Sequence, residues 1–489
     1  MDMKTRAIFF AAILAAHAGT QIGLGATGTF AERMTAMPDS ILQVDPATGR
    51  FLGRNGLASP LAGLVTQAAV DQSAPVKFHV ALKMRNLPEL RERLARGEVL
   101  SQAEMTARYY PLVEDWQAVA DWLTSHGLVV VPENPKAPLH LGVVAHGALA
   151  TVSRTLAVEF VAVQGADGKI YSSAVTPPNV PTRLDGKLIG ITGLQPHLRP
   201  LPQQVTIPAT PESEAFQSGG FPFNPPQYYP TIGPLALLNF YHGLTTAHGG
   251  TNPFDGTGQT IAIMMTQDDV TMLQSDLALF WASIHSSHTL ADLTVINPGW
   301  YAPVVGKNAS NNQVDFEATI DVEWSSGMAE GAKIRLYESL NPEDFVPKII
   351  SDKATIPGLN QASGSFGFTE FGVTENGTIT PAVEQGYSQY FASLIAAGVT
   401  YFAPTGDYGS NPNTNDDGPG YPTWPISVLY PACDPAVVAV GGTNMYCPDT
   451  GVKNPTGEGD VYDSLSPLRC RTQCPRGHLG AWQLHVLFP

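Results

Sequence analysis

The acidic segment at residues 315–324 carries the side chains of this sequence that are best suited to proton transfer. Glu317 and Asp321 are four residues apart, so on a helix both carboxyls lie on one face. Apolar rows flank that face, which places this pair in the buried stripe, whereas Asp315 and Glu323 point away from it. Like charges at this spacing repel, and burial penalises ionisation, so the pair should share a proton. That arrangement suits a general base with a supporting acid, while a structural ion pair with Lys or Arg is the open alternative.

A second candidate is Asp407, which lies in a Gly-Asp-x-Gly turn directly after the apolar segment Tyr401–Ala403. In α/β proteins, sites gather in loops at the carboxyl ends of parallel strands, so this turn stands where a site is expected. Taken alone, an aspartate between glycines more often caps its own backbone. The motif by itself therefore favours turn capping.

Strands and helices alternate around both motifs, from about residue 235 onward. This rhythm predicts a mostly parallel sheet with helices on both faces, hence an α/β fold. The expected strands are 260–265, 333–337, 400–403 and 437–440, and the expected helices are 272–281, 314–325 and 381–397.

Residues 75–196 form a separate unit that repeats a strand–helix–strand plan. Two such halves predict a ferredoxin-like α+β sandwich. The first half comprises 76–82, 115–125 and 128–131, and the second comprises 139–144, 147–155 and 158–163, followed by a turn into 170–172.

The N-terminus has the order of features found in secretory signal peptides. Lys4 and Arg6 precede a short apolar run, and Ala16-His17-Ala18 provides a small-residue cleavage site. We therefore expect residues 1–18 to be a signal peptide and the protein to be secreted. No later apolar run has the length of a membrane span, so we expect no membrane-spanning segment.

Three further segments have no expected core of their own. Residues 27–74 are a leader segment. Residues 197–234 are rich in proline, which predicts an extended linker and a processing region. The catalytic pattern covers 235–467, and the tail at 468–489 does not continue it, so we expect a divergent or frame-shifted terminus.

The composition excludes some partners. The 27 Lys and Arg residues stand against 43 Asp and Glu residues, and a formal net charge of -16 argues against nucleic acid or an anionic membrane as a partner. Of the four cysteines, Cys433 and Cys447 are candidates for a disulfide. Cys470 and Cys474 lack a second pair of ligands nearby, which disfavours zinc.

Together these motifs resemble the sedolisin family of serine-carboxyl peptidases, which includes the kumamolisins and tripeptidyl peptidases. The resemblance covers about residues 75–467, with 75–196 similar to that family's activation domain. In the activation domain it rests on Tyr109, on the Trp122-Leu123 helix end and on His126–Leu128. In the later part it rests on the two motifs above and on Gly256–Ile263, Gly327–Ile334, Ser365–Gly367, Tyr430–Ala432 and Ala439–Thr443.

The resemblance implies a secreted zymogen with a subtilisin-like fold that hydrolyses protein or peptide substrates through an acyl-enzyme. By motif match Glu317 would be the general base, Asp321 would hold and polarise it, and Asp407 would be the oxyanion-hole acid. At acid pH a histidine is protonated and cannot accept the serine proton, whereas a glutamate can. The resemblance also implies calcium as a cofactor and the protein's own prodomain as an intramolecular inhibitor.

The sequence departs from the family pattern at the nucleophile. The Gly-Thr-Ser-x-x-x-Pro segment and the calcium loop that follow Val-Gly-Gly-Thr in the family are absent, and Ser464 and Ser466 do not stand in that context. We therefore expect a truncated peptidase domain and no activity from the chain as written. The alternative is a pseudopeptidase that binds peptides or its own prodomain.

Other enzyme classes fit less well. An Asp-His-Ser relative using Asp268 or Asp269 would need its His-Gly pair after the first strand, but His242 and His248 precede it. No HExxH, P-loop or GxGxxG motif after a strand is present, which disfavours metal and nucleotide enzymes.

Overall fold

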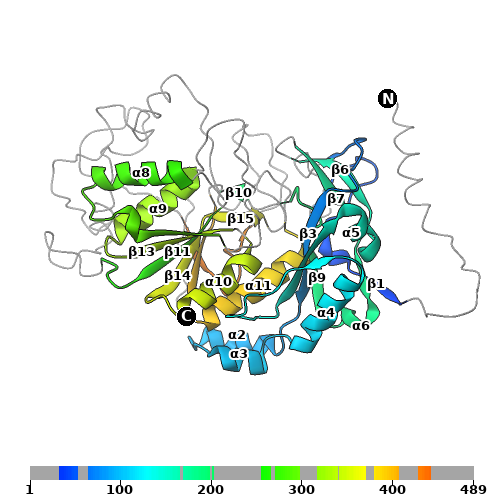
Figure 1. The fold of residues 1–489 in the computed structure, drawn as a ribbon, viewed down its shortest axis with the longest axis horizontal. Coiled ribbons are helices and arrows are strands. Elements are labelled where there is room, and N and C mark those ends of the chain that lie inside the picture. The colour runs from blue at the N-terminus through cyan, green and yellow to red at the C-terminus, as the bar shows by residue number, and fades with distance from the viewer. Residues whose placement is uncertain are drawn as a thin grey trace, which may run out of the picture.

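The fold consists of two sheet-containing units joined by a shared helical layer (Figure 1). In this computed structural model, the described residues are 32–52, 64–165, 169–198, 201–202, 255–265, 270–297, 316–339, 341–369, 379–406 and 428–441.

The later unit is built on a six-stranded sheet in which all pairings are parallel. Its strand order is β12-β13-β11-β14-β16-β18, so β11, the first strand in sequence, lies inside the sheet. The parallel sheet predicted from the sequence is thereby confirmed. The strands are β11 (Thr260–Met265), β12 (Leu293–Ile296), β13 (Lys333–Glu338), β14 (Leu359–Gly364), β16 (Thr400–Pro404) and β18 (Val438–Val440).

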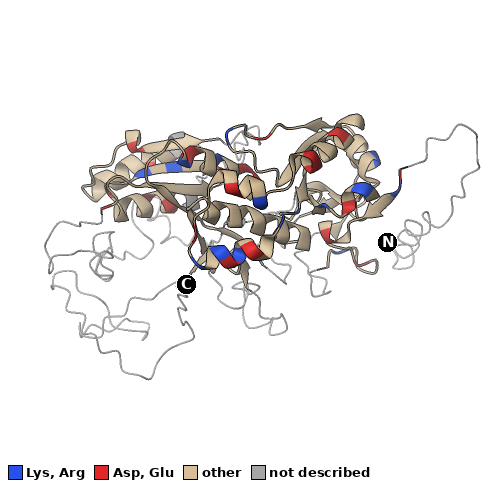
Figure 2. Cartoon of the chain, turned by 90° about the horizontal axis from the view of Figure 1, so that it is seen from below, with Lys and Arg blue, Asp and Glu red and all other residues tan. Residues whose placement is uncertain are grey.

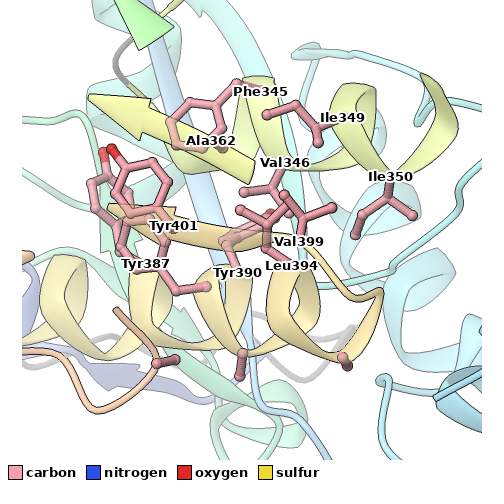
Figure 3. Close-up of a cluster of buried hydrophobic side chains, with 14 of the residues drawn as sticks. Phe345, Val346, Ile349, Ile350, Ala362, Tyr387, Tyr390, Leu394, Val399 and Tyr401 are labelled. Atoms are coloured by element: carbon pink, nitrogen blue, oxygen red, sulfur yellow. The ribbon is translucent and has the colours of Figure 1, made fainter. Parts of the chain in front are cut away.

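Helices cover both faces of this sheet because its strands are apolar on both sides. In β11, Ala262 and Met264 join one buried cluster, whereas Ile263 and Met265 join the other. The second of these clusters lies under α8 (Val270–Ser283) and α9 (Phe316–Met328), and the first lies under α10 (Pro342–Lys353) and α11 (Pro381–Ala396). Figure 3 shows the aromatic and aliphatic side chains of α10 and α11 packed against the strands.

The N-terminal unit is built on a four-stranded sheet of order β4-β5-β3-β9, in which every pairing is antiparallel. Its apolar core includes side chains of α4 and α5. The elements are β3 (Pro75–Leu82), α4 (Val113–Ser125), β4 (Val129–Val130), β5 (Gly142–Ala148), α5 (Leu149–Leu156), α6 (Thr182–Asp185) and β9 (Leu188–Thr192).

A smaller sheet and part of the leader segment complete this unit. β2 (Leu64–Val65) pairs with β6 (Phe160–Gln164), which forms a hairpin with β7 (Ile170–Ala174). β1 (Met34–Ala36) pairs with β8 (Asn179–Pro181), and a short 3-10 helix, η1 (Pro38–Ser40), follows. Met37 and Ile41 are buried in the core of the unit, so the leader segment adds to a core that later residues build.

Helix α11 is the layer that joins the two units, because it packs against β16 on one side and against β9 and β3 on the other. The adjacent helices α2 (Leu87–Ala95) and α3 (Gln102–Arg108) also belong to the N-terminal unit. Residues of both units, such as Tyr109 and Phe391, share one buried cluster. The two units therefore bury a common core.

Charged residues of both signs are interspersed along the described ribbon (Figure 2). On α2 and α3 they form a network in which Arg93 pairs with Glu98 and Glu104, and its Nη1 also donates to the Tyr109 hydroxyl at 3.0 Å. Among the residues that the structure describes, no helix combines the length and apolar character that a membrane span requires.

One strand and one helix lie later in the sequence than their patterns predict. The strand expected at 139–144 is β5, and the helix expected at 147–155 is α5. Pro138 lacks the N–H that a sheet ladder needs, and His140 has a left-handed backbone with φ 54°. Regular pairing therefore begins only at Gly142.

Candidate active site

The carboxyl edge of the parallel sheet is where the described part of the chain gathers its candidate catalytic groups. The chain leaves β11 toward α8 on one face and leaves the neighbouring β13 toward α10 on the other. In open α/β sheets, such a reversal creates a crevice at the strand ends where ligands bind.

Asp321 is held at this edge by a serine that follows β14. The Ser365 hydroxyl donates a hydrogen bond to Oδ1 of Asp321 at 2.7 Å. Both side chains are half-buried. Because Ser365 comes directly after the last residue of β14, the bond ties the middle of α9 to the end of a central strand.

The orientation of α9 follows from its packing. Thr319, Val322 and Ser326 form its buried row, at helical spacing. The Trp281 indole on α8 donates to the Ser326 hydroxyl at 2.8 Å, and that hydroxyl donates to the Val322 carbonyl oxygen at 2.6 Å. This network fixes α9 against α8 and leaves Asp321 beside the buried row, within reach of Ser365.

Tyr401 extends the cluster at the strand ends. A Cβ added to Gly364 would lie 2.5 Å from the Tyr401 hydroxyl oxygen, so only glycine admits this phenol beside β14. Burial, and then the negative charge of Asp321, raises the pKa of Tyr401 above its usual value. Tyr401 therefore stays a neutral hydroxyl near Asp321.

For Glu317 and Asp407, the structure describes the neighbouring elements but not the side chains. Glu317 lies in α9, four residues before Asp321, but its side chain is outside what the structure describes. Asp407 is also outside the described residues. The strand that leads to it, β16, pairs with β14, and Gly406 ends the described segment with φ 87°.

Glu323 differs from its expected position. Its spacing from Glu317 and Asp321 predicts a side chain that points away from the buried stripe, but Glu323 is half-buried and faces Asp276 of α8. Burial and then the Asp276 charge raise the pKa of Glu323 to about 7. The buried row of α9 runs through Thr319, Val322 and Ser326, and this row leaves Glu323 on the side toward α8.

The segment that follows the N-terminal unit crosses the same edge. β10 (Leu201–Pro202) pairs antiparallel with β15 (Phe366–Thr369), with Leu201 opposite Gly367 and Pro202 opposite Phe366. β15 begins one residue after Ser365. Residues 201–202 of the predicted linker therefore form an added strand on β15, next to the segment that carries Ser365.

Several expected site features are not placed by the structure. Ser464, Ser466, Cys447 and the pairs around His242 and His248 are outside the described residues. Cys433 is exposed. In the ranges that are described, no three His, Cys, Asp or Glu side chains are grouped so as to hold a metal ion.

Comparisons with known proteins agree with these features. A family model for the Pro-kumamolisin activation domain matches residues 62–196. Xanthomonalisin from Xanthomonas sp. (strain T-22) is 22% identical over 458 residues, which cover 86% of this chain and 51% of that protein. Sedolisin from Pseudomonas sp. (strain 101) is 24% identical, with 88% and 70% covered. Kumamolisin from Bacillus sp. (strain MN-32) is 24% identical, with 82% and 68% covered.

The matches differ in how much of each relative they cover and in how similar the structures are. The chain spans about half the length of xanthomonalisin. Among solved structures, the Epidermin Leader Peptide Processing Serine Protease (EpiP) from Staphylococcus aureus has a TM-score of 0.35 and 11% identity, covering 76% of this chain and 70% of that chain. A likeness this weak adds nothing to the sheet topology. The sequence relatives, together with the activation-domain match over residues 62–196, support placing this chain with the sedolisin family.

Proposed function

We propose that this chain is the zymogen of a secreted, acid-acting serine-carboxyl endopeptidase, in which Glu317, Asp321 and Asp407 carry the acid–base chemistry. The observation that carries the proposal is the Asp321–Ser365 hydrogen bond at the carboxyl edge of the sheet, with a peptide strand paired alongside it. A carboxylate fixed beside an extended peptide backbone is what proton transfer during peptide hydrolysis requires.

The roles follow from charge and position. Glu317, one helical turn before Asp321, takes the proton of the attacking hydroxyl, and Asp321 orients the Glu317 carboxyl. Asp407, when protonated, donates to the oxyanion that forms on the substrate carbonyl. Carboxyls can act in this way at acid pH, where an imidazole is already protonated. No step of the proposal uses calcium.

The fold expectations belong to the same proposal. The strand order β4-β5-β3-β9 with α4 and α5 supports a ferredoxin-like activation domain. The parallel sheet with helices on both faces supports a subtilisin-like catalytic domain. The pairing of Leu201–Pro202 with β15 supports autoinhibition, because the linker occupies an edge that an extended substrate would use.

The test is hydrolysis of casein at about pH 4, where carboxyl-based chemistry is favoured. We compare the chain as given with the chain extended by the serine-bearing C-terminal segment of a sedolisin. In whichever form is active, Glu317→Gln and Asp321→Asn should lower kcat by at least about 100-fold. Glu330→Gln, on an exposed carboxyl after α9, is the matched control and should stay within about twofold.

A non-catalytic peptide-binding protein is the second candidate, because the β15 edge already accepts a backbone strand. The same experiment separates the two. If the extended chain hydrolyses nothing but retains binding to casein peptides, the peptidase proposal is wrong and the binding protein is supported.

A further inference from the structure

The face of β3 that points away from the core of the N-terminal unit carries a histidine and a lysine, and it lies between the two units. Side chains of a strand alternate, and here Phe78, Val80 and Leu82 point into the core of the N-terminal unit. Lys77, His79 and Ala81 therefore point the other way, toward α10 and α11, and we call these three residues the docking face. The approach is close, since a Cβ added to Gly386 on α11 would lie 3.5 Å from the Cβ of Ala81.

His79 is the most enclosed polar group of the docking face, with 4% of its surface exposed. Its Nε2 lies 3.2 Å from the hydroxyl of Tyr390 on α11. Its Nδ1 is buried and has no hydrogen-bond partner among the described residues. The ring lies against Gly142, where an added Cβ would come within 1.7 Å of Nε2. This pocket accepts a neutral imidazole but offers nothing to a second ring proton.

The charges that face His79 come from four elements. On β3, Lys77 repels a proton on the imidazole. On α10, burial raises the pKa values of Glu343 and Asp344, so these carboxyls lose their negative charge early as the pH falls. Glu343 Oε2 and Asp344 Oδ1 also lack hydrogen-bond partners in the described part of the chain.

The remaining two elements supply no countercharge for His79. On α11, burial keeps the pKa of Tyr390 well above its usual value, so this phenol stays neutral. In the segment before β5, Glu133 already pairs with His140 at 2.5 Å. At acid pH a protonated His79 would therefore face Lys77 with little negative charge nearby.

We propose that His79 is an acid-sensitive lock between the activation domain and the α10–α11 layer, and that protonation of its imidazole undocks the two units. The proposal rests on the proposed function only where undocking is equated with zymogen activation.

The sign and size of the effect follow from linkage. Burial, and then the charge of Lys77, lowers the pKa of His79 to about 3 in the docked state. In the undocked state the docking face meets water, and the pKa returns to about 6.5. Between these values His79 binds one more proton in the undocked form, so its contribution to the docking equilibrium constant should fall about 150-fold from pH 6.5 to pH 4. Glu343 and Asp344 act in the opposite sense, because burial raises their pKa values in the docked state, so the effect of the histidine is the difference between the unmodified chain and His79→Gln.

Two hydrogen bonds donated by backbone amides cross between the units and report docking in the intact chain. The Leu100 N–H donates to the Ala396 carbonyl oxygen at 2.8 Å, and the Met84 N–H donates to Oε1 of Gln389 at 2.5 Å. Amide hydrogen exchange of Leu100 and Met84, corrected for intrinsic rates, measures undocking. The amides of the β3–β5 ladder measure unfolding of the activation domain itself.

From pH 6.5 to pH 4, protection of Leu100 and Met84 should fall about 150-fold more in the unmodified chain than in His79→Gln, while the β3–β5 ladder keeps its protection in both. Glu343 and Asp344 titrate in both chains, so the difference isolates His79. His126→Gln, on an exposed histidine of the same unit, is the matched control and should leave the dependence unchanged.

An equal pH dependence in His79→Gln, or loss of ladder protection together with Leu100, would overturn the proposal. If His79→Gln does not fold, the histidine titration of the intact chain by NMR decides. A His79 midpoint near 3 supports the lock, and a midpoint near about 6.5 overturns it. None of these readouts needs peptidase activity, so the lock and the peptidase proposal can fail separately.

Discussion

The N-terminal unit encloses two histidines in pockets that differ in what the ring faces. His79 lies on the docking face, against Tyr390 of the catalytic unit. His197 faces inward, where its Nδ1 lies 2.7 Å from the Ser173 hydroxyl oxygen and its ring centroid lies 4.4 Å from that of Phe51 in the leader segment. Burial lowers both pKa values to about 3. The neighbours of each ring thus decide which structural change its protonation drives.

His197 acts on the fold of the activation domain itself. Around it, Leu42, Phe51 and Val163 form a small buried cluster, which we call the leader pocket. Gln195 holds the leader segment there, because its amide accepts from the Leu42 N–H at 2.8 Å and donates to the Leu42 carbonyl oxygen at 2.9 Å. A proton on His197 should loosen the leader pocket, whereas a proton on His79 should separate the units.

The largest expected effect is on the pH dependence of the leader pocket. The folded pKa of His197 is about 3 and the unfolded value about 6.5, so its contribution to stability is present above pH 6.5 and is lost as pH falls toward 3. By pH 4 the loss should reach about 2 to 3 kcal/mol, reduced from the full linkage value because the ring is partly exposed. His197→Gln should remove this loss. The measurement is exchange of the β6–β7 ladder amides at pH 6.5 and pH 4.

Measuring both readouts in both histidine variants tests whether the two pockets respond to acid independently. His79→Gln should leave the β6–β7 ladder as acid-sensitive as in the unmodified chain, and His197→Gln should leave the Leu100 amide unchanged. If either variant alters both readouts equally, the two pockets form one cooperative unit and the distinction between them is wrong.

The next largest effect comes from a substitution that weakens docking at constant pH. Gln389 on α11 accepts from the Met84 N–H and donates to the Leu82 carbonyl oxygen at 2.8 Å. Gln389→Ala leaves both buried backbone groups without a partner, which should weaken docking by about 2 kcal/mol. The readout is protection of the Leu100 amide at pH 7. Gln117→Ala, on an exposed residue of α4, should change it by less than about 0.5 kcal/mol.

The sequence predicted elements with strong periodicity more reliably than contacts between distant elements. The strand expected at 260–265 matches β11, and the helix expected at 381–397 ends one residue later than α11. Helix α10 was not predicted, because Pro342 and Pro347 interrupt its pattern. Those prolines do not prevent the helix, since burial of Phe345, Val346 and Ile349 supplies the stabilising contacts.

In the candidate site, too, the sequence predicted local features better than contacts between distant residues. Local spacing singled out Asp321, but nothing local indicated that Ser365, 44 residues later, donates to it. Alternation along 76–82 predicted a strand, yet it did not reveal that helices more than 260 residues away bury its His79 and half-bury its Lys77. The first pairing depends on how distant elements of one unit come together and the second on how two units dock, and no periodicity within a segment records either.

The smallest effect tests whether docking depends on close packing as well as on polar contacts. Gly190 on β9 faces α11, and an added Cβ would lie 2.5 Å from the Cβ of Ala382 and 2.9 Å from the Ser40 hydroxyl oxygen. Gly190→Ala should therefore weaken docking by about 1 to 2 kcal/mol through overpacking, measured at the Leu100 amide. Gly186→Ala is the matched control, because its φ is -62° and no atom lies within 4 Å of the added Cβ. It should be neutral or stabilise by up to about 0.5 kcal/mol. Equal effects from the two glycines would mean that polar contacts alone hold the units together.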